Sequence, residues 1–259
     1  MQVSVHQWLG MPMTTSLLEG LGDACVQVWL AEVPACPAEM AVAAMLLDGP
    51  ERLRAERFMF PQARNEFVFG RALLRRLLAA CLIIHPSQVA IAYGPHGKPR
   101  LMGGSADSDL RFNIAHSESL IAVAITRGRE VGIDIESTTR PLDWSLIAER
   151  VFSQSELCQL RSLHESEQNL AFLTAWTRKE AFLKATGEGL SDKISTIDIA
   201  FPLSHPTAWP PSPTAGKGKW EIHPIPLPAG FCGALVVEDP ADPGRAGPLA
   251  TPHRCCAIA

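Results

Sequence analysis

The chain has no excess of positive charge. Its 259 residues include 23 Lys and Arg against 27 Asp and Glu, which gives a formal net charge of −4 and a pI of about 6.1. Nucleic-acid-binding domains usually carry basic patches and a high pI, so the overall charge gives no support for a nucleic-acid partner. With 47% hydrophobic and 19% charged residues, the composition indicates a globular protein with a substantial core rather than a disordered chain.

Long hydrophobic runs are also missing. The most apolar stretches, AEMAVAAMLL and LLAACLII, are shorter than the roughly 20 residues that a membrane-spanning helix needs. The first residues lack a basic segment followed by an apolar run, which is the pattern of a secretory signal peptide. We therefore expect a cytoplasmic protein with no membrane segment.

Paired cysteine motifs are absent as well. The seven cysteines are odd in number and include no CxxC pair, so neither a disulfide framework nor a zinc site is indicated. Cys255 and Cys256 are adjacent in a Pro- and Gly-rich tail. Reduced thiols are the simplest interpretation for a cytoplasmic protein.

Hydrophobic periodicity predicts a chain of mixed helices and strands. Helical spacing is found in residues 51–58, 66–82 and 167–190. Ser153 and Glu156 form a capping box that predicts a further helix start, and Gly187 is a natural end for the last helix. The segments with strand-like composition are 26–33, 91–101, 112–117, 120–126, 131–136, 219–225 and 230–237. Helices and short strands occur in both halves, so we expect two α+β halves.

The segment VGIDIE places two carboxylates on one face of a strand. Alternation puts Val131, Ile133 and Ile135 on one face. Asp134 and Glu136 share the other face, roughly 6–7 Å apart, where their charges repel each other. A bound cation would remove this repulsion, and a strand edge that faces water is the alternative explanation.

The long predicted helix carries a third acidic residue. Trp176, Glu180 and Lys184 are spaced four residues apart and therefore lie in one stripe. A surface Glu–Lys pair would explain this spacing, but the neighbouring Leu173 and Leu183 indicate a half-buried face on which both charges need partners. Glu180 could thus be a third oxygen ligand beside the two strand carboxylates, and such a set is typical for Mg²⁺, which also binds water and phosphate.

Two other residues are candidates for phosphate contacts. Lys98 stands between Gly97 and Pro99 in a stiff turn, which could present backbone N–H groups and an ammonium to a phosphate. A solvated lysine is the simpler interpretation. His116 follows a strand without a second histidine at zinc-binding spacing, so a structural hydrogen bond is its simplest role.

Four motifs, taken in order, resemble the Sfp-type 4′-phosphopantetheinyl transferases. The motifs are GKP, FNIAHS, VGIDIE and WTRKEAFLKATGEGL. The resemblance covers residues 54–190, and its specificity comes from the order and spacing of the motifs. It implies an α+β fold of two similar halves related by a pseudo-twofold axis, with the active site between them. We accordingly expect an N-terminal half at 1–128, a C-terminal half at 129–240 and a flexible tail at 241–259.

The resemblance also implies an activity. Family members transfer the 4′-phosphopantetheine arm of coenzyme A to a serine of an apo acyl, peptidyl or aryl carrier protein and release adenosine 3′,5′-bisphosphate. The expected cofactor is Mg²⁺, the co-substrate is coenzyme A, and the expected state is a monomer. The alternatives are a non-catalytic module that binds coenzyme A or carrier proteins, and another Mg²⁺-dependent phosphoryl-transfer enzyme.

Residue roles follow from the positions that match the family motifs. Asp134, Glu136 and Glu180 match Mg²⁺ ligands. Glu180 also matches the residue proposed as general base for the carrier serine, and Lys184 matches the lysine at the leaving phosphate, so the expected catalytic residues are Glu180, Lys184 and Asp134. The implied contacts to coenzyme A are Arg54, Arg71, Tyr93, Gly94, Pro95, His96, Gly97, Lys98, Pro99, Asn113, Ile114, Ala115, His116, Asp134, Glu180 and Lys184.

Three of these contacts are implied to be with phosphate groups. Arg54 matches a 3′-phosphate-binding arginine, His116 matches a phosphate-binding histidine, and Lys98 is expected near a phosphate. One position departs from the family, because Ala115 stands where serine is common. We expect a side-chain hydroxyl contact to be missing there and a backbone contact to be retained.

Overall fold

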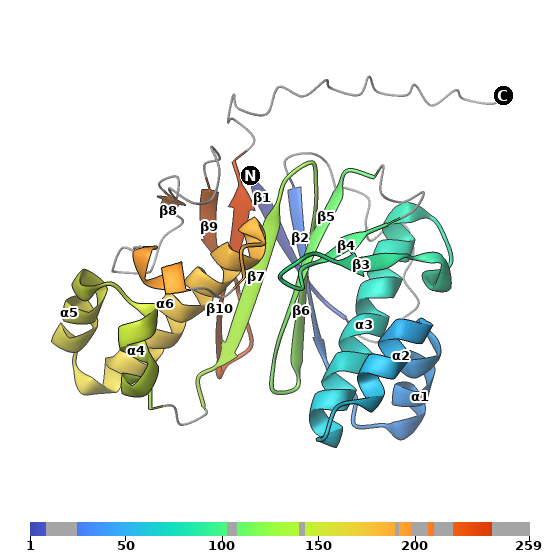
Figure 1. The fold of residues 1–259 in the computed structure, drawn as a ribbon, viewed down its shortest axis with the longest axis horizontal. Helices are drawn as coiled ribbons and strands as arrows, with labels where there is room; N and C mark the ends of the chain where they lie inside the picture. Colours follow the sequence, from blue (N-terminus) through green and yellow to red (C-terminus); the bar gives the residue numbers. More distant parts are fainter. Residues whose placement is uncertain are drawn as a thin grey trace.

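The computed structural model describes residues 1–8, 25–102, 108–139, 143–189, 192–197, 207–209 and 220–239. Its strands lie at the centre of the molecule, and its helices lie on two outer sides (Figure 1). The α+β class expected from the sequence is confirmed. None of the described helices combines the length and the apolar character that a bilayer span requires.

The described strands form two four-stranded sheets and one two-stranded sheet. The first sheet has the order β1-β2-β6-β5 and consists of β1 (Gln2–Gln7), β2 (Cys25–Glu32), β5 (Leu110–Ser117) and β6 (Leu120–Arg127). The second has the order β7-β10-β9-β8 and consists of β7 (Val131–Ser137), β8 (Thr207–Trp209), β9 (Trp220–Pro224) and β10 (Phe231–Glu238). The small sheet pairs β3 (Ile91–Tyr93) with β4 (Pro99–Leu101). All pairs are antiparallel except β1 with β2.

Six α-helices and two short 3₁₀ helices complete the described fold. The α-helices are α1 (Pro37–Met45), α2 (Gly49–Glu56), α3 (Pro61–Leu82), α4 (Ser145–Val151), α5 (Gln154–Ser162) and α6 (Glu165–Thr186). The 3₁₀ helices are η2 (Pro86–Gln88) and η4 (Asp192–Thr196).

Two of the predicted helix boundaries are confirmed. The hydroxyl of Ser153 accepts from the amide of Glu156, whose side chain accepts from the amide of Ser153, so α5 begins with the predicted capping box. Helix α6 ends at Gly187, whose φ of 76° is left-handed and suits glycine.

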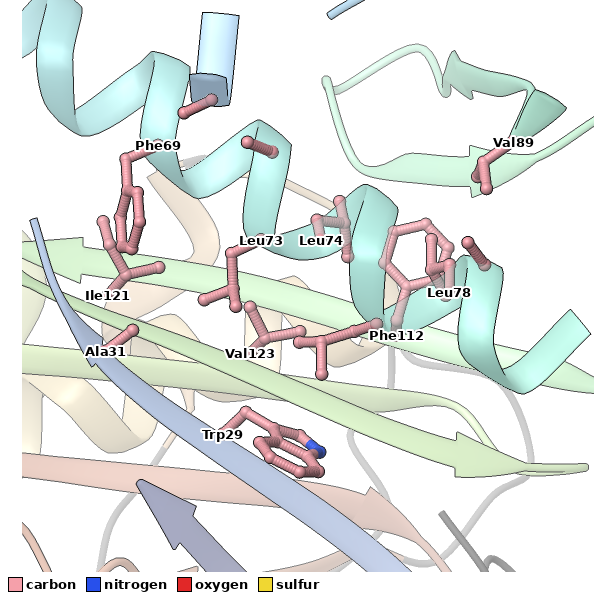
Figure 2. Close-up of a cluster of buried hydrophobic side chains, with 14 of the residues drawn as sticks. Trp29, Ala31, Phe69, Leu73, Leu74, Leu78, Val89, Phe112, Ile121 and Val123 are labelled. Atoms are coloured by element: carbon pink, nitrogen blue, oxygen red, sulfur yellow. The ribbon is translucent and has the colours of Figure 1, made fainter. Parts of the chain in front are cut away.

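Each sheet packs its own helices on its outer face. On the first sheet, Phe69, Leu73 and Leu78 of α3 lie over Ile121 and Val123 of β6 (Figure 2). Burial of each such side chain contributes about 1.5–3 kcal/mol. A second cluster lies between α4–α6 and the second sheet. The helices are therefore fixed to the sheets by apolar contact, which makes the sheets a rigid frame for side chains at their edges.

A third apolar cluster joins the two sheets. It contains the inner faces of β2, β5, β6, β7 and β10, including Val131, Ile133 and Ile135. These three residues are at most 1% exposed, as the alternation in VGIDIE predicts, so Asp134 and Glu136 point to the other side of β7.

Strands β5 and β7 meet without a backbone ladder. They belong to different sheets, but Oδ1 of Asn113 accepts from the amide of Ile133 at 3.0 Å. Further along, Oγ of Ser117 accepts from the amide of Ser137, also at 3.0 Å. We call this side-chain-bridged junction of β5 and β7 the seam.

The seam separates strands of the first sheet, within residues 2–127, from strands of the second, within residues 131–238. The predicted division into 1–128 and 129–240 follows the same line and stays a prediction. The predicted tail at 241–259 lies outside the described residues.

Candidate active site

Gly132 allows helix α6 to lie directly against β7. A Cβ atom at this position would overlap the carbonyl oxygen of Ala181 and the amide nitrogen of Ala185. Only glycine fits there without a shift of the helix. Because Gly132, Asp134 and Glu136 share one face of the strand, the same close approach places both carboxylates beside α6.

Asp134 is buried against a lysine from that helix. Nζ of Lys184 donates to Oδ1 of Asp134 at 2.7 Å, and Asp134 is only 6% exposed. Its other oxygen, Oδ2, has no hydrogen-bond partner among the described residues. Burial raises the pKa of Asp134 to about 6, although the Lys184 ammonium acts in the opposite direction.

Glu180 is the second acid with an unsatisfied oxygen. Its buried Oε1 has no hydrogen-bond partner in the described part of the chain. Burial raises the pKa of Glu180 to about 7, and the negative charges of Asp134 and then Glu136 add to this increase, while Lys184 opposes it. Glu180 of α6 therefore lies close enough to Asp134 and Glu136 of β7 for their charges to interact.

These acids do not form a closed metal centre by themselves. Within the described residues, no three His, Cys, Asp or Glu side chains converge closely enough to hold a metal ion. Asp134, Glu136 and Glu180, which we call the acidic cluster, nevertheless include two buried oxygens, Oδ2 of Asp134 and Oε1 of Glu180, that have no hydrogen-bond partner among the described residues. Asp134, Glu136 and Glu180 could hold Mg²⁺ if water and phosphate oxygens complete its coordination.

A cavity of about 440 Å³ lies beside the acidic cluster and reaches from α3 to α6. Glu180 and Lys184 belong to its wall. So do most of the coenzyme A contacts predicted from the sequence: Arg54, Arg71, His96, Gly97, Lys98, Pro99, Asn113, Ile114, Ala115 and His116. The other predicted residues, Tyr93, Gly94, Pro95, Asp134 and Glu136, are not part of the wall. The cavity is of the size of small-molecule sites, and its lining is both basic and apolar.

Two arginines at this cavity lie near the same two aromatic rings. The guanidinium of Arg71 lies 5.1 Å from the ring centroid of Tyr93 and 5.5 Å from that of Phe67. Arg54 lies 5.5 Å and 5.1 Å from the same two rings. Nη1 of Arg71 is buried without a hydrogen-bond partner among the described residues. An anion at this place would satisfy it. Tyr93, which is not part of the cavity wall, contacts the site through these two arginines.

His116 has an acidic neighbour that the sequence does not reveal. Its Nδ1 lies 3.5 Å from Oε2 of Glu66, on α3, and its side chain is 60% exposed. Both residues line the cavity. The largely exposed ring of His116 is therefore available to a ligand in the cavity.

Lys98 is engaged by the protein itself. Its Nζ donates to Oε2 of Glu130 at 2.8 Å, to the carbonyl of Val131 at 3.4 Å and to the carbonyl of Ala185 at 2.7 Å. An ammonium has three N–H donors, and all three have acceptors here. Lys98 therefore ties the β3–β4 turn to the end of α6, and its predicted phosphate contact stays a prediction.

Ala115 lines the cavity from a buried position. It is 2% exposed, and its side chain belongs to the cluster between the sheets. Its contact with the cavity is therefore through the main chain, in line with the backbone contact expected from the sequence. A serine hydroxyl at this position would have to be accommodated within an apolar cluster.

Comparison with known proteins gives consistent matches over most of the chain. The family model "4′-phosphopantetheinyl transferase superfamily" matches residues 130–232, and the model "4′-phosphopantetheinyl transferase, N-terminal" matches residues 33–127. The 4′-phosphopantetheinyl transferase HetI of Nostoc sp. is 36% identical over 201 residues, which is 78% of this chain and 83% of HetI.

Two further relatives have similar names. The 4′-phosphopantetheinyl transferase AcpT of Salmonella typhimurium is 34% identical over 177 residues, 68% of this chain and 81% of AcpT. A 4′-phosphopantetheinyl transferase of Bacillus subtilis is 30% identical over 151 residues, 58% of this chain and 64% of that protein. The two family-model matches together include the cavity wall and the acidic cluster.

Proposed function

Because the chain belongs to the 4′-phosphopantetheinyl transferase superfamily, we propose that it transfers the 4′-phosphopantetheine arm of coenzyme A to a serine of an apo carrier protein. The other product is adenosine 3′,5′-bisphosphate. One observation carries the proposal: basic side chains of α3 and β5 and the acid–lysine pair of α6 line one cavity. A binding module without turnover would not need Asp134, Glu180 and Lys184 in mutual interaction.

The cofactor we propose is Mg²⁺, held by Asp134, Glu136 and Glu180. The support is the pair of buried carboxylate oxygens that have no partner among the described residues. When bound, Mg²⁺ would neutralise charge on the pyrophosphate of coenzyme A during phosphoryl transfer.

In this proposal, two side chains of α6 accept the proton and stabilise the charge during the transfer. The carrier serine Oγ forms a bond to the phosphorus that bears the pantetheine arm, and the bond from that phosphorus to the bridging oxygen breaks. Glu180 accepts the serine proton. Lys184 stabilises the negative charge that develops on the leaving oxygen.

The remaining side chains bind and orient coenzyme A. Arg54 and Arg71, stacked on their rings, would hold the 3′-phosphate, and His116 would contact a phosphate nearer to the acidic cluster. The main chain of residues 113–115 would border the nucleotide. Acyl, peptidyl and aryl carrier proteins are the proposed partners, and the monomeric state and cytoplasmic location stay predictions.

The transfer is tested by intact-mass spectrometry. Apo carrier proteins from fatty-acid, polyketide and peptide synthesis are incubated with the protein, Mg²⁺ and either coenzyme A or acetyl-coenzyme A. We expect at least one carrier to gain the mass of one phosphopantetheine arm, and a chelator to prevent this. Absence of a mass shift with every carrier would support the binding-module alternative.

Substitutions test the acidic cluster in the same assay. We expect Asp134→Ala and Glu180→Gln to abolish transfer while leaving the fold intact by circular dichroism. Glu165→Gln is the matched control, because Glu165 is an exposed acid in the first turn of the same helix. Full transfer by both cluster variants would remove the proposed roles of these carboxylates.

A further inference from the structure

Ser117 lies at the end of β5, outside the set of residues that the sequence motifs assign. It is 8% exposed. Its Oγ accepts from the amide of Ser137 at 3.0 Å and donates to Oε2 of Glu136 at 3.1 Å. The hydroxyl thus reaches across the seam to two consecutive residues of β7.

The two contacts give the hydroxyl a defined direction. A serine hydroxyl has one O–H donor and two acceptor lone pairs. The Ser137 amide can only donate, so it engages a lone pair and leaves the single O–H proton to point at Glu136. The backbone amide of Ser137 therefore orients the Ser117 hydroxyl, and this hydroxyl in turn holds the side chain of Glu136.

Asp134 and Glu136 are held by different donors. Asp134 is held by the Lys184 ammonium. Within the described part of the chain, the hydroxyl of Ser117 is the hydrogen-bond donor that contacts Glu136. A long, partly exposed glutamate with no such contact would sample several rotamers.

We propose that Ser117 is a positioning residue for metal binding. It donates to Oε2 of Glu136 and so restricts this side chain, which would hold Mg²⁺ together with Asp134 and Glu180. The inference rests on the proposed magnesium site. Residues that orient a metal ligand in this way typically change metal affinity 10–100-fold when they are removed.

The proposal also gives the seam a functional consequence. Ser117 belongs to the first sheet and Glu136 to the second. Correct placement of the ligand therefore requires that the two sheets are docked, so the site is complete only in the assembled fold.

Direct metal titration tests this without measuring turnover. Mn²⁺ replaces Mg²⁺, and free Mn²⁺ is followed by electron paramagnetic resonance in the presence of coenzyme A. We expect Ser117→Ala to weaken Mn²⁺ binding about tenfold or more, and Ser117→Thr, which keeps the hydroxyl, to restore most of it. In a Glu136→Gln background, Ser117→Ala should have little further effect.

Thr126→Val is the matched control. Thr126 is a buried residue of the same sheet, and its hydroxyl donates to the carbonyl of Cys25 at 3.1 Å, away from the acidic cluster. We expect its loss to leave Mn²⁺ affinity unchanged. If Ser117→Ala does not fold by circular dichroism, Ser117→Cys, a weaker donor of similar size, takes its place.

The outcomes distinguish the proposed magnesium site from the proposed role of Ser117. If the unmodified protein with coenzyme A does not bind Mn²⁺, the magnesium site itself is wrong. If the unmodified protein binds Mn²⁺ and the folded Ser117 variant binds it equally well, the site stands and the role of Ser117 is overturned. Weakening by Thr126→Val to the same degree would also overturn that role.

Discussion

At the scale of single residues, Glu180 links the site to pH. In the metal-free protein, burial and the charge of Asp134 raise the pKa of Glu180 from 4.5 to about 7. Between these two values the folded protein holds a proton that the unfolded chain has released. Its free energy of unfolding therefore falls as the pH rises through this window.

We predict that this fall is smaller in the Glu180→Gln variant, which has no carboxyl group to titrate. The measurement is thermal unfolding in a chelator at a series of pH values from about 4.5 to 7. Asp134, whose pKa is about 6, contributes in the same direction in both proteins. Because the charges of Glu180 and Asp134 interact, the difference between the two curves reports the Glu180 carboxyl together with its coupling to Asp134. Parallel curves would contradict the prediction.

Substitution of Arg71 should weaken the binding of coenzyme A without slowing the transfer step. Arg71 is buried, its guanidinium lies near the rings of Phe67 and Tyr93, and one of its N–H groups has no partner among the described residues. A hydrogen bond to a charged group contributes about 1.5–3 kcal/mol. We therefore predict that Arg71→Met raises KM for coenzyme A roughly tenfold or more, with a much smaller change in kcat.

Steady-state kinetics with coenzyme A and with 3′-dephospho-coenzyme A checks this prediction. The preference for the 3′-phosphate should shrink in the variant. Arg76→Met is the control, since Arg76 lies on the same helix but contacts the ring of Trp8 and not the cavity. An unchanged preference in Arg71→Met would exclude the 3′-phosphate contact.

Short sequence motifs reveal residues that contact a ligand, but they do not reveal contacts between side chains of separate elements. Asp134 and Glu136 could be paired from the sequence because they alternate on one strand, and Glu180 and Lys184 because they are one helical turn apart. The family resemblance, not local spacing, joined the two pairs into one site. Glu66 beside His116, and Ser117 beside Glu136, are contacts between separate elements. The partners of Lys98 were hidden for the same reason, since Ala185 lies 87 positions away in the chain.

At the scale of secondary-structure elements, the packing of α6 on β7 determines the site. We predict that Gly132→Ala lowers the free energy of unfolding by about 1–3 kcal/mol, because the added methyl group forces the helix away from the strand. It should also reduce transfer sharply, since Asp134 and Lys184 would separate. Denaturant unfolding and the carrier mass assay measure the two effects.

Gly49→Ala serves as the control for this change. A Cβ atom at Gly49, in the first turn of α2, meets nothing within 4 Å. Its stability should be unchanged or slightly higher, because alanine has a smaller backbone entropy than glycine in the unfolded chain. Equal stability of the two variants would show that α6 does not need glycine at position 132.

Most elements could be predicted from the sequence because their patterns are local. The capping box of α5, the glycine end of α6 and the alternation of β7 are each contained in a few neighbouring residues. Strand β1 gave no such signal, as it is defined by parallel pairing with β2 far along the chain. Helix α3 begins at Pro61, five positions before the predicted start at residue 66. The prediction missed this first turn because its residues are mostly exposed and lack apolar periodicity.

At the scale of the whole molecule, the cavity is lined by helices that pack on different sheets, α3 on the first and α6 on the second. Coenzyme A that binds in this cavity of the folded protein, and not to the unfolded chain, should stabilise the fold by mass action, about 2.7 kcal/mol at one hundred times its Kd. We predict a larger rise in Tm with coenzyme A and Mg²⁺ together than the sum of the separate rises. Thermal unfolding in the four ligand conditions measures this, and strictly additive shifts would argue against a metal that contacts the substrate.

The seam described above also provides an internal reporter. The amides of Ile133 and Ser137 find their acceptors on side chains of the opposite sheet rather than in a ladder. Deuterium uptake at these two amides therefore reports separation of the two sheets, whereas uptake within β6 reports unfolding of the first sheet. If the sheets separate before either unfolds, Ile133 and Ser137 will exchange earlier than their neighbours, and bound coenzyme A will slow them first.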